Sequence, residues 1–404
     1  MRIVPIYRVK PGMRLGRSVQ DQDGRLIITA GITLNERLLT LLERQGYTAL
    51  YIADKIGDVE LPELVSLQTK QEVIRSIAQF IEIEALHARR LSLSLAPGHL
   101  RPLSGRNMIS KARYDVSLNM LKAAEMLVRE IISRKEVLIG MVDIKSLHDY
   151  SFGHSVQVAL NALVVGRILG YDRRELRVLG AGALLHDIGK TVISPSVWMK
   201  PGDLTHEEFA RVRDHPEAGF EILRRTSLGL MPAHTAYQHH ERWDGSGYPR
   251  GLASDKIIGL ARVTAVCDVF DAMTSDRPYK KAQHPMEALS FIVSNSGILF
   301  DPRVVEAFSR VAAPFPVATG VILSTDETAV VKRLNPRALD RPVVAVTKDP
   351  HGNYYAHPRT IDLEQHPEIR IASYAEWYTA PDPGQISAFG GLVASALDRA
   401  LPEG

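Results

Sequence analysis

The feature that most constrains the fold of this chain is a series of histidine and aspartate residues that recurs at intervals of roughly 24 to 32 residues. Several members adjoin apolar runs with helical spacing, such as residues 178–185 and 262–270. This spacing matches one inward-pointing contribution from each of five helices. The sequence therefore predicts a helical bundle whose interior collects the members of the series. These are His154, His186, Asp187, His215, His239, His240 and Asp268.

The residue types in this series predict a site for more than one metal ion. An ionised aspartate is costly to bury unless it is paired or bound to a metal. Imidazole nitrogens together with carboxylate oxygens suit Zn, Fe, Mn or Ni. The His186-Asp187 pair alone would be interpreted as structural, and the other members of the series change that interpretation.

Two expectations follow from helical geometry. Neighbouring residues in a helix point about 100° apart. We therefore expect His239 and His240 to face two different ions, or one ion and one substrate phosphate. Lys190 is four residues after His186, so both are predicted on one helix face, where the lysine would meet a phosphate oxygen.

The composition limits the class of protein. A chain of 404 residues can form two or three domains, and its 45% hydrophobic and 24% charged content is ordinary for a globular protein. A net charge of +3 does not favour nucleic-acid binding. Cys267, the single cysteine, excludes an intrachain disulfide and a zinc finger, and its apolar surroundings predict a core position.

We expect a cytoplasmic protein with no membrane partner. The apolar runs are shorter than the roughly 18 residues that span a bilayer. The N-terminal segment carries charges where a signal peptide has an apolar centre.

The chain divides into four predicted parts. Residues 1–62 read as a small α+β regulatory module, with a hairpin turn at 23–24, a helix at 34–45 and a strand at 48–52. Residues 63–136 read as a helical connector: either solvated helices that pack on a neighbour, or a stalk for dimerisation or signal transmission. Residues 137–315 hold the metal-site residues. Residues 316–404 read as a β-rich extension and tail, with strands at 317–323, 329–332 and 342–347. The fold class is mainly α.

The histidine pair is followed by a segment rich in turn residues. Gly245, Gly247, Tyr248 and Pro249 indicate a loop of fixed conformation, because glycine and proline favour defined turns. This loop would either position the histidine pair or form a docking surface. Trp243 fits equally a stacking role on a base and a packing role.

At these residues the chain resembles the HD-GYP family of bacterial cyclic di-GMP phosphodiesterases. The motifs stand in family order as HSVQVAL, LLHDIGK, HPEAG, HHERWDGSGYP and DVFDAMTSDRPYK, and GILFDPRVVEAF also fits. The resemblance covers roughly residues 140–312. The N-terminal module is similar to a small domain that precedes some members.

The resemblance implies that the seven residues of the series bind metal. Asp187 would bridge two divalent ions and Asp268 would cap one of them. Asp187 and Lys190 would carry the catalytic chemistry, with Lys190 offsetting charge on the phosphate. Some members hold a third metal through a glutamate one turn before the first histidine. Tyr150 occupies that place here, so a dinuclear centre of Fe, Mn, Ni or Zn is favoured.

The resemblance also implies a substrate and partners. The substrate would be cyclic di-GMP, cleaved to pGpG and then to GMP, with phosphate contacts from Asp271, Arg277 and Lys280. Gly247, Tyr248 and Pro249 would meet cyclase (GGDEF) domains, or serve only to make the loop rigid.

Two other functions stay open at this stage. The site could serve another nucleotide, as in the wider HD phosphohydrolases, or the chain could be a non-enzymatic cyclic di-GMP sensor.

Overall fold

The computed structural model describes residues 1–20, 25–45, 47–53, 59, 63–94, 106–135, 137–139, 150–194, 197, 205–275 and 282–375. Several predictions fall outside these ranges and are not tested: the turn at 23–24, the substrate contacts of Arg277 and Lys280, and the tail at 384–404.

The N-terminal module is a small α+β unit, as predicted. The antiparallel strands β1 (Arg2–Pro5), β5 (Ala49–Ala53) and β2 (Arg14–Leu15) form its sheet in that order, beside a short ribbon of β3 (Val19–Gln20) and β4 (Leu26–Ile28). A 3-10 turn, η1 (Ile6–Arg8), directly follows β1. Helix α1 (Glu36–Arg44) begins where the Asn35 side chain accepts a hydrogen bond from the Leu38 amide at 2.9 Å.

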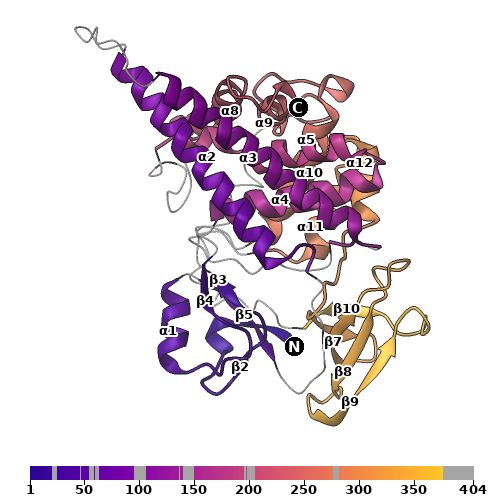
Figure 1. Ribbon diagram of the computed structural model, residues 1–404. Helices are drawn as coiled ribbons and strands as arrows, with labels where there is room; N and C mark the ends of the chain where they lie inside the picture. Colours follow the sequence, from indigo (N-terminus) through magenta and orange to yellow (C-terminus); the bar gives the residue numbers. More distant parts are fainter. Residues whose placement is uncertain are drawn as a thin grey trace.

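The body of the molecule is helical (Figure 1). Its long helices α2 (Leu67–Ser94) and α3 (Arg106–Ser133) lie side by side against the bundle. The bundle follows as α4 (Tyr150–Ile168), α5 (Arg173–Leu184), η2 (Ile188–Val192), α7 (His206–Arg213), α8 (His215–Leu223), α9 (Leu230–Gln238), η3 (Ser254–Lys256), α10 (Gly259–Thr274), α11 (Pro285–Ser294) and α12 (Pro302–Ser309).

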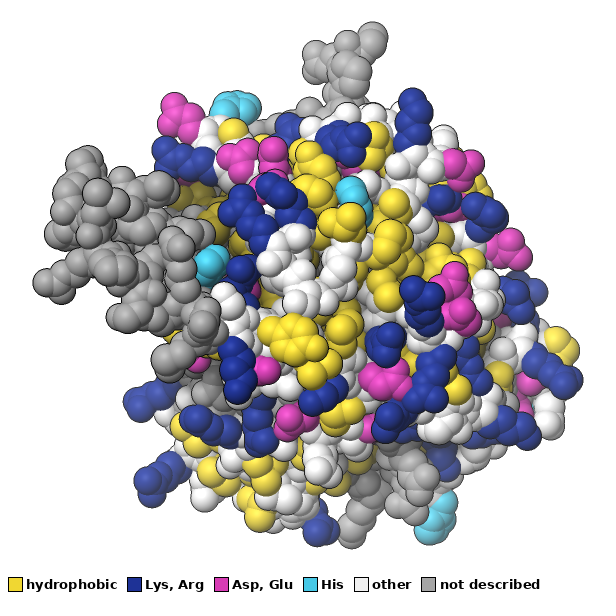
Figure 2. Space-filling view, turned by 45° about the horizontal axis from the view of Figure 1, so that its top comes forward, with side chains coloured by type: hydrophobic (Ala, Val, Ile, Leu, Met, Phe, Trp, Pro, Cys, Tyr) yellow, Lys and Arg dark blue, Asp and Glu magenta, His cyan; other side chains and the backbone are white. Residues whose placement is uncertain are grey.

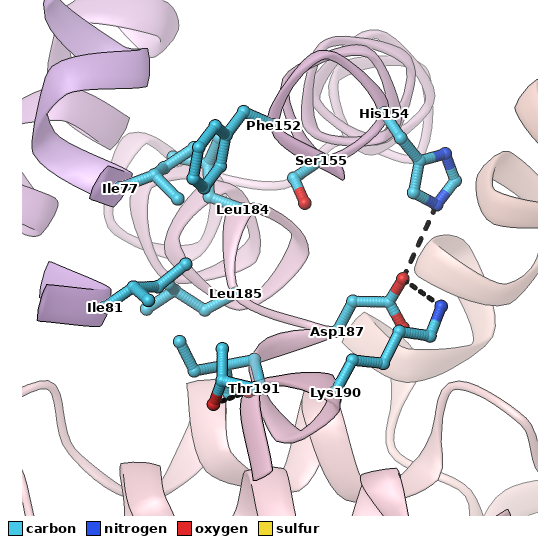
Figure 3. Close-up of a pocket in the computed structure, with 11 residues that line it drawn as sticks. Ile77, Ile81, Phe152, His154, Ser155, Leu184, Leu185, Asp187, Lys190 and Thr191 are labelled. Carbon is cyan, nitrogen blue, oxygen red and sulfur yellow. Dashed lines mark hydrogen bonds and ion pairs between the residues drawn. The ribbon is translucent and has the colours of Figure 1, made fainter. Parts of the chain in front are cut away.

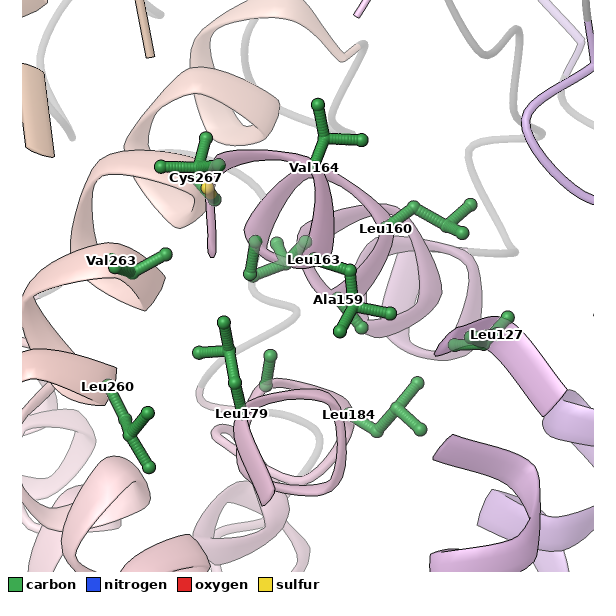
Figure 4. Packing of buried hydrophobic residues seen from close by; sticks show 14 of the residues in the cluster. Leu127, Ala159, Leu160, Leu163, Val164, Leu179, Leu184, Leu260, Val263 and Cys267 are labelled. Atoms are coloured by element: carbon green, nitrogen blue, oxygen red, sulfur yellow. The ribbon is translucent and has the colours of Figure 1, made fainter. Parts of the chain in front are cut away.

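Helix α4 lies at the centre of this body, between α5 and α10 (Figure 4). Its sequence is apolar on every side, because it has neighbours on every side. Leu163 of α4 is fully buried, together with Leu179 of α5 and Cys267 of α10, so the predicted core position of Cys267 is confirmed.

Helix α2 belongs to the same hydrophobic core as the bundle. Its Val73 and Phe80 are fully buried, and Ile77 is 2% exposed. The description of residues 63–136 as solvated helices therefore captures only the outer face of α2, where Arg75 and Glu82 are exposed.

The C-terminal part is a five-stranded antiparallel sheet. Its order is β10 (Ile371–Tyr374), β6 (Gly320–Leu323), β7 (Thr328–Arg333), β8 (Val343–Lys348) and β9 (Tyr354–Asp362). The three predicted strands are confirmed with shifted ends, and β9 and β10 were not predicted. The sheet packs beside the N-terminal module, where Ile3 and Tyr51 share its apolar cluster.

The fold is thus mainly α with an α+β module and a terminal sheet, as the sequence predicted. Within the described residues, no helix combines the length and the apolar character needed to cross a membrane. On the face seen in Figure 2, lysine and arginine side chains are interspersed with acidic and apolar ones, in keeping with the small net charge.

Candidate metal centre

The structure brings the seven predicted metal-site residues together from five helices. His154 lies in α4 and Asp268 in α10, whereas His215 opens α8. The other members follow helix ends: His186 and Asp187 come after α5, and His239 and His240 come after α9. The ligand atoms form two groups in which all atoms lie within 4.8 Å of one another: Asp187, His215, His239 and His240, and His154, His186 and Asp187. Asp187 is common to both groups.

Three of the histidines are oriented by backbone carbonyl groups. The Nδ1–H groups of His186, His215 and His239 donate to the carbonyl oxygens three residues earlier, at 2.8, 2.6 and 2.8 Å. An imidazole that donates through Nδ1 is the tautomer whose Nε2 carries a lone pair. All three lone pairs are therefore available to the interior of the site.

This orientation creates an arrangement that suits a cation. Nε2 of His215 lies 3.2 Å from Nε2 of His239, and both atoms are acceptors in the tautomer just described. Oδ1 of Asp187 lies 3.3 and 3.8 Å from the same two nitrogens. Among the described residues, Nε2 of His186 and Oδ1 of Asp187 are buried with no hydrogen-bond partner. Such groups are costly to bury unless an ion satisfies them, so the donor set fits divalent metal ions.

The charges at the site match those that metal ligands need. Burial would raise the pKa of Asp187, but the Lys190 ammonium and the neighbouring histidines hold this pKa well below its usual value. The pKa of Asp268 is also well below its usual value, because hydrogen bonding to His154 outweighs burial. Burial, reinforced by neighbouring histidines, holds the pKa values of His239 and His240 well below the ordinary value. Ionised carboxylates and neutral imidazoles are the forms that coordinate a metal.

His154 is held differently from the other histidines. Its Nε2 lies 3.1 Å from Oδ1 of Asp268, and its Nδ1 lies 2.7 Å from Oδ2 of Asp271. Burial lowers the pKa of His154, but the hydrogen bonds to Asp268 and Asp271 outweigh it and raise the pKa.

Asp271 departs from its predicted role as a substrate contact. It is 3% exposed and lies behind the imidazole of His154, so its carboxylate orients a ligand instead of facing substrate. The sequence spacing does not distinguish these roles, because Asp268 and Asp271 lie on the same side of one helix.

Lys190 also departs from its predicted position. Helix α5 ends at Leu184, and Lys190 lies in η2, so His186 and Lys190 do not share a helix face. The Lys190 Nζ atom lies 2.5 Å from Oδ2 of Asp187. This lysine is part of the site, but it reaches it through a separate 3-10 turn.

The prediction that His239 and His240 face two different ions, or one ion and one substrate phosphate, is not tested, but the geometry places both rings beside one group of ligand atoms. Both contribute an atom to the group that contains Asp187 and His215. Side chains of neighbouring residues point about 100° apart only within a regular helix. Helix α9 ends at Gln238, so this angle does not apply to His239 and His240.

The loop at residues 241–252 fixes His240 from the outside. The Tyr248 ring stacks on the His240 imidazole with centroids 4.8 Å apart at 23°, and the Arg213 guanidinium lies 4.6 Å from the centre of the Tyr248 ring. Burial raises the pKa of Tyr248, so the phenol stays neutral. At Gly247, a Cβ atom would lie 2.3 Å from the Arg242 amide nitrogen, so only glycine fits there. The Gly-Tyr-Pro segment thus positions a predicted ligand.

Glu241 is a site residue that the sequence reasoning did not single out. Its buried carboxylate accepts hydrogen bonds from the amides of Arg250 at 2.9 Å and Leu252 at 2.8 Å, and it closes the loop. In the sequence, the only indication of this role is that Glu241 directly follows the histidine pair. Trp243 packs beneath the Arg262 guanidinium, 5.4 Å away, and its amide donates to Leu299, which favours packing over base stacking.

The third-metal prediction is not tested, because the Tyr150 side chain lies outside the described residues. Tyr150 is the first residue of α4.

A helical bundle that gathers histidines and aspartates around a shared aspartate defines a class of divalent-metal-binding domain. In agreement, residues 125–304 match the model of the HD domain, and residues 320–378 match a KOW domain associated with HD domains.

Proteins of known name are similar to this chain in sequence. A cyclic di-GMP phosphodiesterase of Pseudomonas aeruginosa is 36% identical over 261 residues, which cover 64% of this chain and 63% of that protein. A cyclic di-GMP phosphodiesterase response regulator of Xanthomonas campestris is 44% identical over 149 residues, covering 36% of this chain and 39% of that protein. A 3′3′-cGAMP-specific phosphodiesterase of Vibrio cholerae is 36% identical over 170 residues, covering 42% and 36%.

The chain therefore spans less than two thirds of the length of these relatives. Among solved structures, an HD-GYP-type protein of Bdellovibrio bacteriovorus is 13% identical with a TM-score of 0.44, covering 76% of this chain and 97% of that one. Residues 125–304 thus form an HD domain, and the chain is similar to cyclic di-GMP phosphodiesterases over the parts that it shares with them.

Proposed function

We propose that this protein is a metal-dependent phosphodiesterase that hydrolyses cyclic di-GMP to pGpG and then to GMP. The observation that carries the proposal is the pair of Nε2 acceptors of His215 and His239, 3.2 Å apart beside an unsatisfied oxygen of Asp187. A divalent cation bound between these atoms would satisfy all of them. The names of the relatives supply the substrate.

The two groups of ligand atoms support a dinuclear centre. Asp187, His215, His239 and His240 would hold one ion, and His154, His186 and Asp187 the other, with Asp268 capping the second. Fe, Mn, Ni and Zn all accept nitrogen and carboxylate ligands. Such ions supply Lewis acidity and lower the pKa of water. A third ion is disfavoured, because Tyr150 provides no carboxylate.

The remaining residues bind and orient. Lys190 neutralises Asp187 in the free protein, and it is 27% exposed, so it can turn to a phosphate oxygen when substrate enters. Asp271 holds the His154 ring. Arg277 and Lys280 would contact the substrate, the arginine as a two-pronged donor and the lysine as a point charge.

The proposal also covers the domain division of the chain and its protein partners. The chain would divide into residues 1–62, 63–136, 137–315 and 316–404. Residues 63–136 and 137–315 share one apolar cluster, whereas the cluster of the terminal sheet includes Ile3 and Tyr51 of the N-terminal module. The loop at residues 241–252 would meet a cyclase (GGDEF) domain, and residues 63–136 would serve in a homodimer or in signal transmission. A second messenger as substrate places the protein in the cytoplasm.

The test is metal analysis of anaerobically purified full-length protein combined with identification of products. Cyclic di-GMP, 3′3′-cGAMP and linear nucleotides are compared as substrates. Asp187→Ala should remove bound metal and turnover together, whereas the exposed Asp115→Ala should change neither. Faster turnover of a non-cyclic nucleotide would reject the proposed substrate. Full metal content in inactive Asp187→Ala would reject its ligand role.

A second substrate is favoured by one specific finding. Relatives named as 3′3′-cGAMP-specific phosphodiesterases match this chain over 170 and 175 residues at 36% and 35% identity. Preference for 3′3′-cGAMP in the same comparison would replace cyclic di-GMP and keep the reaction. Protein that holds two metal ions and binds cyclic di-GMP without cleaving it would instead be a sensor.

A further inference from the structure

A cavity of about 170 Å³ opens directly beside the metal centre (Figure 3). One side of it is apolar, formed by Ile77 and Ile81 of α2, Phe152 of α4 and Leu185 after α5. The opposite side is polar and consists of His154, Asp187 and Lys190. The cavity therefore joins an apolar compartment to the groups that would hold metal and phosphate.

The size of the cavity limits what it can hold. Sites for whole ligands of drug size are roughly 300–1,000 Å³, so this cavity accommodates only part of a dinucleotide. A phosphate does not suit the apolar side, because a charge there would lose its hydration without compensation. A nucleobase does suit it, because its faces are apolar and its edge is polar. Phe152 offers a ring on which a base can stack. Thr191 lies at the other end of the cavity, where its hydroxyl donates to the Ile188 carbonyl oxygen.

We propose that this cavity binds one purine base of the cyclic dinucleotide and that α2 forms its outer wall. The proposal rests on the proposed function for the identity of the substrate. It extends that function to a segment outside the matched HD domain, because residues 77 and 81 precede residues 125–304. The base in the cavity fixes the position of the phosphodiester over Asp187 and Lys190.

The packing of α2 suits it to this role. Ile77 and Ile81 are one helical turn apart, so they present a continuous apolar surface to the cavity. Ile77 is 2% exposed, which anchors the helix in the core, whereas Ile81 is only partly buried. The helix also packs against α4 and η2, the elements that carry His154 and Lys190.

Ile81→Trp is the decisive variant, because a larger side chain at a partly buried position fills the cavity with little disturbance of the core. The matched control is Gln79→Trp, which adds the same side chain to an exposed position of the same helix. Thermal melting of both variants checks that they fold. Phe152→Ala is a second variant that removes the stacking surface and leaves the cavity open.

Binding is measured by calorimetry on the metal-loaded full chain with two probes, GMP and ribose 5-phosphate, which differ by the base. In the wild type, GMP should bind about tenfold or more tightly than ribose 5-phosphate, as expected for one stacked base. Ile81→Trp and Phe152→Ala should abolish this difference and leave ribose 5-phosphate binding unchanged. Gln79→Trp should behave as the wild type.

The outcomes separate this proposal from the proposed function. Equal affinity of the wild type for the two probes overturns the base site, even if cyclic di-GMP is cleaved. Parallel loss of both probes in Ile81→Trp also overturns it, because the substitution then disturbs the metal centre itself. A base-dependent difference in protein that cleaves no cyclic dinucleotide leaves the base site in place and rejects the phosphodiesterase.

Discussion

Glu241→Gln tests whether one buried carboxylate holds the loop that covers His240. Each carboxylate oxygen of Glu241 accepts one backbone amide, from Arg250 at 2.9 Å and from Leu252 at 2.8 Å. Glutamine has the same shape, but it offers one oxygen and one NH₂ group. One of the two amides must therefore face a donor, and the other keeps only a neutral acceptor.

The magnitude follows from these two contacts. A hydrogen bond to a charged group contributes about 1.5–3 kcal/mol, and a buried donor left without an acceptor costs about 1–3 kcal/mol. Because the loop can relax and admit water, we expect its opening free energy to fall by about 2–3 kcal/mol. Since about 1.4 kcal/mol is tenfold, amide exchange in the loop should be faster by about 30-fold to 150-fold.

Hydrogen exchange followed by mass spectrometry on peptides covering residues 245–255 measures this effect. The control is Glu306→Gln, an exposed glutamate of α12. Exchange in the loop should accelerate in Glu241→Gln and stay unchanged in Glu306→Gln. If the Arg250 and Leu252 amides exchange at the wild-type rate in Glu241→Gln, the carboxylate does not hold the loop, and the account of how His240 is positioned fails.

Three further predictions concern other parts of the molecule. Chelation should lower the melting temperature of the metal-loaded protein, because an ion at 100 times its dissociation constant stabilises by about 2.7 kcal/mol; calorimetry with and without chelator measures this. Gly189→Ala should reduce bound metal and cost about 1–3 kcal/mol or more, since a Cβ would lie 1.9 Å from the His215 carbonyl oxygen; metal analysis and melting check it. Burial raises the pKa of Glu327, but hydrogen bonds from Tyr355 and Arg359 outweigh it and lower the pKa below 4.5. Its stabilisation is therefore present above pH 4.5 and lost as the pH falls through the lowered pKa, so the melting difference from Glu327→Gln should shrink in acid.

The helical bundle and its ligand set were predictable because both depend on spacing along the sequence. The members recur about once per helix and connection, and intervals of that length are enough to predict a shared interior. Cys267 was predictable for the same reason, since the run around it is apolar on all sides. Local pattern and residue type carry this information without any knowledge of tertiary contacts.

The missed strands show where pattern fails. Strand β9 is exposed at most of its positions and lies at the edge of its sheet, so its burial pattern does not alternate. Strand β10 has only four residues, and its middle is exposed. The contribution of α2 to the cavity also could not be predicted from the sequence. Ile77 and Ile81 have the spacing of ordinary core residues, and only the tertiary structure places them beside η2 and α4.

The geometry of the site follows from where helices end. The last four carbonyls of a helix lack an intrahelical partner. Ala183, Val212 and Ala236 lie in the last turns of α5, α7 and α9, and their carbonyls accept from the histidines three residues later. One contact thus satisfies the helix end and turns an Nε2 lone pair inward.

This coupling accounts for the departures from the predicted site. The three carbonyl-bound histidines stand at or beyond the ends of helices, so the angular steps of a regular helix do not govern where their rings point. His239 and His240 can therefore meet one group of ligand atoms. His154, by contrast, lies inside α4, where its own helix supplies no free carbonyl, and it takes the carboxylate of Asp271 as its Nδ1 acceptor. A histidine just past the last turn of a helix is consequently a stronger signal of an oriented ligand than a histidine within it.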